Sequence, residues 1–389
     1  MITIRNRTAI VGIGNTSFGT TRYPLPDSSR SLACQAIMAA IEDAGLSPKE
    51  IDGMMKISMD TSDASGIADA LGLNLKFFGR TIWGGHGACA MVAQAAAAIT
   101  AGLAKNVVCF RSISQSQDMS YGGTGAAFAN GVPGLLGWQL PIGLFTAPQA
   151  AGIGASRHFH LYGTTRDHLA NIALACRKHA NQNPNAFFYD KKMTREDYFN
   201  SPMVSYPICR FDCCLESDGA CAVIVSSAEM AKDLKQRPVY IMAATQGGLS
   251  YDCFPQLLVK QVDKWQDENW HAAQQAYRMA GVVPADVDVA QIYDAFSILV
   301  LMMLETLGFC RVGEGGPFTE NGNLEWPDGG LPLNTSGGAL SEAYMHGMNH
   351  VIEAVRQLRG ISTAQVKDCE IALVSSANAV PSSILILGR

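Results

Sequence analysis

Short apolar runs alternate with alanine-rich helical patterns along the whole chain, and this alternation predicts the fold class. Strands that alternate with helices favour mostly parallel or mixed sheets covered on both faces, which is an α/β architecture. The predicted strands are Thr8–Gly12, Gly53–Ile57, Asn106–Ser112, Ser217–Ser227, Val239–Ala244, Val289–Tyr293, Ile371–Ser375 and Ile384–Leu387.

An internal echo indicates that the chain contains a duplicated unit. Residues 36–52 read AIMAAIEDAGLSPKEID, and residues 272–288 read AAQQAYRMAGVVPADVD. In both, a glycine ends the helical pattern, a proline begins a short second turn, and an aspartate leads into an extended segment. The matched positions are Gly45 and Gly281, Pro48 and Pro284, and Asp52 and Asp288.

A second repeated pattern follows the first in both parts of the chain. Residues 86–110 and 346–375 each read as a helix, a glycine stop and an apolar strand. Repetition of two motifs predicts two halves, 1–236 and 237–389, the first with a long loop insertion at about 113–216. In the helical pattern at 88–102, nine of the fifteen residues are alanine or glycine, and the only polar ones are Gln94 and Thr100. Because a helix that is apolar all round is buried, we expect it between two sheets, which gives five layers.

Composition narrows the classes of function. The 389 residues are 48% hydrophobic and 16% charged with a net charge of -5, which excludes a disordered chain. Lysine and arginine (29) do not outnumber aspartate and glutamate (34), so a nucleic-acid or anionic-membrane surface is not expected. No apolar run is long enough for a membrane span, and the N-terminal residues lack a signal pattern. Eleven scattered cysteines indicate reduced thiols, hence a cytoplasmic protein.

Several motifs, taken in order, carry a resemblance to a known family. They are YGTTR (162–166), RKHANQNPNA (177–186), SDGACAVIVSSAE (217–229), YDAF (293–296), NTSGGALSEAYMHG (334–347) and the closing ILILGR. Together they resemble the thiolase superfamily, and within it the sterol-carrier-protein thiolases and their lipid-transfer-protein relatives. The resemblance implies a thiolase fold, a five-layered α-β-α-β-α structure built from two duplicated halves.

The catalytic positions of that family are changed in this chain. Counting back from the glycine that ends the buried helix places Gly85, not Cys89, where thiolases keep the nucleophilic cysteine. Tyr344 stands at the histidine of the family's Gly-His-Pro motif, and Tyr293 at the asparagine or histidine of its third motif. The fourth motif reads SSANAVPSS and holds neither cysteine nor the expected glycine. Claisen chemistry through a thiolate is therefore not expected.

Two tyrosines at two catalytic positions resemble the steroid side-chain aldolases of the lipid-transfer-protein branch. The resemblance implies retro-aldol cleavage of a β-hydroxyacyl-CoA, such as a steroid side-chain thioester, to a ketone and a short acyl-CoA such as propionyl-CoA. Tyr293 and Tyr344 are then the catalytic residues. It also implies a small zinc-ribbon and OB-fold partner, a homodimer core, a heterotetramer overall, and no cofactor in this chain, zinc being expected only in the partner. The dimer edge is expected at Val107–Ser112.

The chemistry is consistent with a tyrosine pair. Retro-aldol cleavage needs a base for the β-hydroxyl proton and an acid for the enolate carbon, but no covalent nucleophile. Bringing a tyrosine from its ordinary pKa near ~10 to ~7 costs about 4 kcal/mol, so the site should hold hydrogen-bond donors. We expect these among helix-start N–H groups, His346 and Asn378. Gly85 and His86, beside the buried helix, are further candidates for substrate contact, although His86 also suits a capping and packing role.

Other interpretations stay open at this point. Glu342, His346 and His350 would share one face if 341–356 were helical, which suits metal ligands, although the first and last lie far apart for one ion. Asp294 follows Tyr293 on a strand, so it should point to the opposite face and hold a loop. The chain as a whole also fits a non-catalytic acyl-CoA-binding subunit, or a thiolase that uses Cys89.

Overall fold

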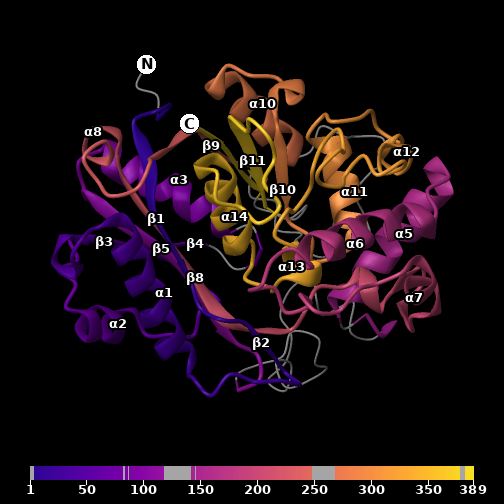
Figure 1. Ribbon diagram of the computed structural model, residues 1–389, viewed down its shortest axis with the longest axis horizontal. Coiled ribbons are helices and arrows are strands. Elements are labelled where there is room, and N and C mark those ends of the chain that lie inside the picture. Colours follow the sequence, from indigo (N-terminus) through magenta and orange to yellow (C-terminus); the bar gives the residue numbers. More distant parts are fainter. Residues whose placement is uncertain are drawn as a thin grey trace.

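The computed structural model describes residues 4–81, 84–85, 87–117, 142–144, 146–247, 268–376 and 382–389 (Figure 1). Its centre is a 10-stranded mixed sheet with the order β10-β11-β12-β9-β1-β8-β5-β3-β4, and β2 pairs with β8. The first half supplies β1 (Thr8–Asn15), β2 (Gly19–Thr20), β3 (Gly53–Ile57), β4 (Phe77–Thr81), β5 (Asn106–Ser114) and β8 (Ser217–Ser227). The second half supplies β9 (Val239–Gln246), β10 (Val289–Ile292), β11 (Ile371–Ser375) and β12 (Ser383–Gly388).

All the strands expected from the sequence are present, and within the main sheet β2 and β4 are additional to them. The two half-sheets are joined edge to edge, because β1 pairs antiparallel with β9 at Ala9–Tyr240 and Ile10–Val239. The strands therefore form one hydrogen-bonded path rather than two separate sheets.

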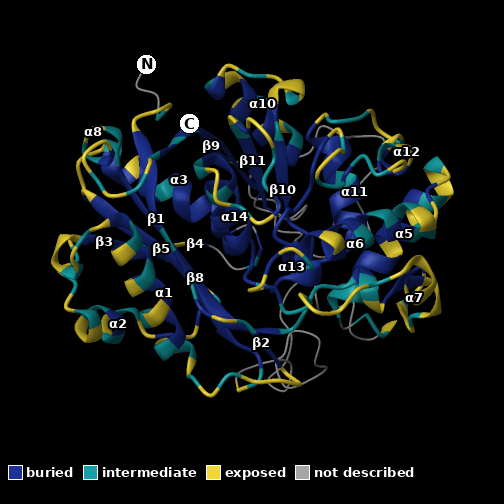
Figure 2. Ribbon diagram, viewed as in Figure 1, coloured by how far each residue is buried: buried dark blue, intermediate teal, exposed yellow. Residues whose placement is uncertain are grey.

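Helices lie in three layers around this path, so the five expected layers are present (Figure 1). On the outside of the first half, α1 (Ser29–Ala44) packs on β1, β8 and β5. Between the half-sheets, α3 (Gly87–Thr100) and α14 (Met348–Arg359) contact strands of both halves. On the outside of the second half, α10 (Glu268–Ala280) packs on β9 and β12. Figure 2 shows the central strands of the sheet and most of the middle layer as buried.

The remaining helices surround this frame. Of these, α5, α6 and α11 share one apolar core with the second half-sheet. The other helical elements are α2 (Ala64–Leu71), α5 (Ala147–Tyr162), α6 (Arg166–Ala180), α7 (Arg195–Asn200), α8 (Ala228–Ala231), α11 (Ser297–Thr306), α12 (Gly315–Phe318), α13 (Gly338–Ser341), and the short 3-10 turns Pro48–Glu50, Arg210–Asp212 and Pro284–Asp286. A small ribbon of β6 (Met203–Ser205) and β7 (Ile208–Cys209) lies apart from the main sheet. Across the described helices, none is long and apolar enough to cross a membrane.

The duplication seen in the sequence is a duplication of structure. In both halves a left-handed glycine ends the first helix, and a 3-10 turn then leads into the next strand. The two aspartates make equivalent contacts. The Asp52 carboxylate accepts from the Lys105 and Asn106 amides, at 2.8 and 3.0 Å, where β5 begins. The Asp288 carboxylate does the same for the amides of residues 370 and 371, at 2.8 and 2.9 Å, where β11 begins.

One expectation about the sheet is wrong. The segment Val107–Ser112 is not an edge, because β5 pairs with β3 on one side and with β8 on the other. The edge of the first half is β4, which pairs with β3 and carries Phe78 with 49% of its surface exposed. Apolarity alone did not separate these strands, because β5 is apolar through burial on both faces.

Candidate active site

The two tyrosines predicted from the sequence lie side by side. Tyr293 directly follows β10, and its amide donates to the Ser375 carbonyl (3.3 Å), which extends the pairing with β11. The Tyr344 amide donates to the Ser217 hydroxyl (2.9 Å) at the start of β8. The two phenol oxygens are 2.7 Å apart, within hydrogen-bond distance. Folding thus joins side chains that are 51 residues apart in the chain.

Tyr344 does not lie in a helix. It lies in the turn between α13 and α14, four residues before Met348. The helix is interrupted because His346 and Gly347 adopt left-handed backbone conformations, with φ of 52° and 88°. This turn directs Tyr344 toward Tyr293, and their ring centroids are 6.2 Å apart at an angle of 61°.

The Tyr293 ring occupies the space beside Gly85, the residue that the family resemblance aligns with the thiolase cysteine. A Cβ atom added to Gly85 would overlap the Cζ and phenol oxygen atoms of the Tyr293 ring. No side chain fits at residue 85 while this ring is in place. The glycine at residue 85 and the tyrosine in the family's third motif are therefore linked, because the tyrosine ring fits only where residue 85 has no side chain.

Burial determines the protonation of Tyr293. The side chain is 4% exposed, and desolvation raises the pKa of Tyr293 well above its ordinary value. Negative charge on Tyr344 or Cys214 would raise this pKa further. Tyr293 therefore keeps its proton near neutral pH, and its hydroxyl is available to donate to the Tyr344 oxygen.

His346 lies beside this pair, as the sequence suggested for a site residue. It is 1% exposed, and its ring centroid is 4.6 Å from that of Tyr344. Its Nδ1 atom accepts a hydrogen bond from Nε of Arg111, on β5, at 3.2 Å. Arg111 was not expected from the sequence, because nothing in an apolar strand pattern marks its one arginine as part of a site.

Comparisons with known proteins show the family to which the chain belongs. Residues 256–389 match the family model described as thiolase C-terminal domain-like. The chain is 42% identical to the steroid side-chain-cleaving aldolase of Thermomonospora curvata, over 98% of this chain and 97% of that one. It is 41% identical to the 17-hydroxy-3-oxo-4-pregnene-20-carboxyl-CoA lyase of Mycobacterium tuberculosis, over 99% of this chain and 100% of that one.

Among solved structures, the Ltp2-ChsH2(DUF35) aldolase matches with a TM-score of 0.91 and 41% identity, covering 100% of this chain and 99% of that chain. The chain belongs to the steroid side-chain-cleaving aldolase family. The chain has the thiolase fold of that family.

Cys89, the alternative nucleophile, is buried in the core. It is 1% exposed on α3, and its thiol donates to the Val374 carbonyl at 3.6 Å. Burial raises the pKa of the Cys89 thiol to about 12. The reactive thiolate is therefore disfavoured at neutral pH.

The proposed metal face does not exist, because residues 342–347 are not helical. Glu342 instead accepts from Ser336 and Asn349, at 2.7 and 3.0 Å. His350 pairs with Asp294 through Nε2 at 2.9 Å. In the described part of the chain, no three histidine, cysteine or carboxylate groups converge as metal ligands.

Asp294 holds a loop, as the sequence indicated. Its carboxylate accepts from the amides of Ala339 and Leu340, at 2.7 and 3.2 Å, and so fixes the start of α13. The other two candidates, His86 and Asn378, lie outside the described residues.

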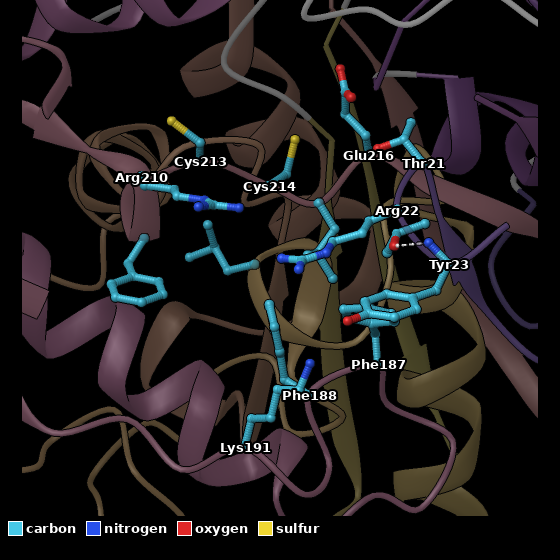
Figure 3. Close-up of a pocket in the computed structure, with 14 residues that line it drawn as sticks. Thr21, Arg22, Tyr23, Phe187, Phe188, Lys191, Arg210, Cys213, Cys214 and Glu216 are labelled. Carbon is cyan, nitrogen blue, oxygen red and sulfur yellow. Dashed lines mark hydrogen bonds between the residues drawn. The ribbon is translucent and has the colours of Figure 1, made fainter. Parts of the chain in front are cut away.

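The structure also contains a pocket that the sequence did not reveal (Figure 3). It has a volume of about 350 Å³ and combines three cations, Arg22, Lys191 and Arg210, with an aromatic wall. The lining residues are Thr20, Thr21, Arg22, Tyr23, Phe187, Phe188, Lys191, Arg210, Phe211, Cys213, Cys214, Leu215, Glu216 and Leu340. They come from distant segments of the chain, so no local motif announces the pocket.

Proposed function

We propose that the protein cleaves the carbon–carbon bond of a β-hydroxyacyl-CoA by a retro-aldol reaction, releasing a ketone and a shorter acyl-CoA. The observation that carries the proposal is the pair of phenol oxygens of Tyr293 and Tyr344, 2.7 Å apart over Gly85. Full-length relatives at 41–42% identity that are named as steroid aldolase and lyase support a steroid side-chain thioester as substrate and propionyl-CoA as the short product.

The protonation of Tyr293 supports separate roles for the two tyrosines. Tyr344 is the base that takes the β-hydroxyl proton, while the Cα–Cβ bond breaks to leave a carbonyl and a thioester enolate. Tyr293, held protonated by burial, gives its proton to the enolate carbon. A proton then passes from Tyr344 to Tyr293 across the 2.7 Å contact and restores the pair. The net transfer is one proton from the hydroxyl oxygen to carbon.

The energetic requirement falls on Tyr344, which must form a phenolate. An ordinary tyrosine ionises at pH 7 at a cost of about 4 kcal/mol. A hydrogen bond to a charged acceptor contributes about 1.5–3 kcal/mol, and the Tyr293 hydroxyl supplies one. The remainder calls for a further hydrogen-bond donor to the Tyr344 oxygen beside the Tyr293 hydroxyl.

The cationic pocket supports a CoA thioester as substrate. Arg22, Lys191 and Arg210 have no ion pair with any described residue. Figure 3 shows Arg22 and Arg210 extending into the pocket from opposite sides. Such side chains suit the phosphates of CoA, and the wall of Tyr23 and Phe187, with ring centroids 6.1 Å apart, suits its adenine.

Cys214, which lines this pocket, lies close enough to Tyr293 for its charge to affect the pKa of that residue. The Cys214 amide donates to the Ala295 carbonyl (2.9 Å), two residues from Tyr293. On the opposite side, Leu340 lies on α13, which precedes the Tyr344 turn. A CoA bound by its phosphates would therefore direct its thioester end toward the tyrosine pair.

We further propose a homodimer paired through β4, with a small zinc-ribbon and OB-fold partner on each protomer. The exposed β4 edge supports the first part, because an open edge strand is a liability unless it is covered. The similarity to the solved Ltp2-ChsH2(DUF35) aldolase supports the small partner protein. Sedimentation at micromolar concentration should show a dimer of this chain and a heterotetramer with the partner. A Phe78→Lys variant should sediment as a monomer, and an unaltered dimer would place the interface elsewhere.

Product analysis tests the proposed reaction directly. The complex of this chain with its partner, given a 17-hydroxy steroid carboxyl-CoA thioester, should yield a 17-ketosteroid and propionyl-CoA without added metal or nicotinamide cofactor. A non-catalytic subunit would bind the thioester and return it unchanged. A requirement for free CoA as co-substrate would instead indicate thiolysis.

A further inference from the structure

A buried arginine that has no part in the proton transfer proposed above contacts the active site. Arg111 is 1% exposed, and its guanidinium pairs with the Asp60 carboxylate at 3.2 Å. Asp60 is itself fixed, because it accepts from the Ser112 amide at 2.8 Å. Arg111 also donates to the Ser112 carbonyl. Its Nε–H is directed at His346, 3.2 Å from Nδ1.

This contact defines the chemical state of His346. A guanidinium stays protonated and has only donors, so Nδ1 of His346 must be the acceptor. An imidazole that accepts at Nδ1 is neutral and carries its hydrogen on Nε2. An imidazolium would instead place an N–H donor against the Nε–H of Arg111, and a second cation beside the first, where both side chains are buried.

The backbone places this fixed imidazole at the reacting groups. His346 has a left-handed φ of 52°, which is uncommon for a residue with a side chain, so the turn imposes its position. Its ring lies against the Tyr344 ring. Next to it, a Cβ atom added to Gly347 would lie 3.5 Å from the Tyr293 ring and 3.7 Å from the Gly85 carbonyl oxygen. Of the charged or titratable groups in the described residues, Arg111, itself paired with Asp60, and Tyr344 contact His346.

We propose that Asp60 and Arg111 are positioning residues that hold His346 as a neutral Nε2–H donor for the oxygen of the thioester enolate. The assignment rests on the proposed retro-aldol reaction, which develops negative charge on that oxygen as the Cα–Cβ bond breaks. A preorganised donor aimed at a developing oxyanion is a large contribution to catalysis, and its removal costs about 10²–10³ in kcat. The positioning residues act only through the histidine.

The tautomer is tested without turnover. Nitrogen-15 NMR of the histidine-labelled protein, with the His346 signals identified by their loss in His346→Gln, should show hydrogen on Nε2 and none on Nδ1 from about pH 5.5 to 8, a range that spans the ordinary histidine pKa. In Arg111→Lys, which keeps a cation for Asp60, His346 should sample both tautomers and titrate. Hydrogen on Nδ1 in the unaltered protein, or titration near its ordinary pKa, would overturn the proposal. If Arg111→Lys does not fold, the spectrum of the unaltered protein decides.

Kinetics test the donor role. His346→Ala should lower kcat about 10²-fold or more with a smaller change in KM, and His346→Gln, which keeps an N–H donor, should recover part of the loss. Arg111→Lys should add an acid limb to the pH profile of kcat, which a merely structural defect would not. Equal activity of the unaltered protein and His346→Ala would exclude the donor role. Absence of cleavage in the unaltered protein, with the Nε2–H tautomer present, would instead overturn the proposed reaction and leave the tautomer assignment intact.

Discussion

The paired hydroxyls of Tyr293 and Tyr344 allow a quantitative test, because phenylalanine removes each hydroxyl and keeps each ring. Acid–base groups contribute typically 10²–10⁴-fold, so Tyr293→Phe and Tyr344→Phe should each lower kcat by about that factor. At about 1.36 kcal/mol for each factor of ten, this is about 3–5 kcal/mol of barrier. Loss of one hydroxyl of the 2.7 Å contact should destabilise the fold by only about 1 kcal/mol.

The double variant examines whether the hydroxyls work as one relay. If a proton passes between them, the second substitution should cost little beyond the first, because groups that act as a unit are not additive. The assay is single-turnover release of the ketone from a β-hydroxyacyl-CoA by the assembled complex, with denaturant unfolding to confirm each fold. Cys89→Ala is the matched control and should lose little activity, and iodoacetamide should spare the unaltered protein. Near-normal turnover of both Phe variants, together with inactivity of Cys89→Ala, would refute the reasoning and favour a thiolase.

Three further outcomes follow from the structure. Gly85→Ala should displace the Tyr293 ring, which should reduce kcat and destabilise the fold by about 1–3 kcal/mol. The double variant Gly85→Ala with Tyr293→Ala should lose less stability than the sum of the two single losses, because the added methyl group then meets no ring. Additive losses in denaturant unfolding would show that the ring does not lie against Gly85. Lys191→Ala should raise KM for the CoA thioester and make KM less dependent on salt, while kcat is retained. A fall in kcat with no change in KM would show that the pocket does not bind CoA. Burial lowers the pKa of His179 to about 4, so His179 binds a proton more readily in the unfolded chain. The unfolding free energy should therefore fall by about 3 kcal/mol as the pH drops from about 6.5 to 4. Denaturant titrations of His179→Gln should show a weaker dependence of the unfolding free energy on pH, and an unchanged dependence would assign it to other groups.

Most of the fold could be read from the sequence because it is encoded locally and twice. The pattern of glycine, proline and aspartate at Gly45–Asp52 and Gly281–Asp288 sets a left-handed stop, a 3-10 turn and a strand start in both halves. Each of these depends on a residue's own backbone preferences and on bonds to nearby chain. The small and mostly apolar residues of α3 likewise indicated its place in the middle layer, since such a helix has little polar surface to present to water. The identity of the two tyrosines was also visible, as departures from an otherwise matching set of motifs.

What the sequence left undecided depends on groups from distant segments. An apolar strand looks alike at an edge and in the interior, so only the pairing of β5 with β3 and β8 moved the expected dimer edge to β4. The turn that breaks the helix at His346 follows from packing against Tyr293 and α3 rather than from local preference, because a non-glycine residue avoids φ of 52°. The pocket of Arg22, Lys191 and Arg210 and the Asp60–Arg111–His346 chain are likewise products of tertiary folding. A charge or hydroxyl acquires its chemistry from the burial and partners around it, and these exist only after the halves have packed together.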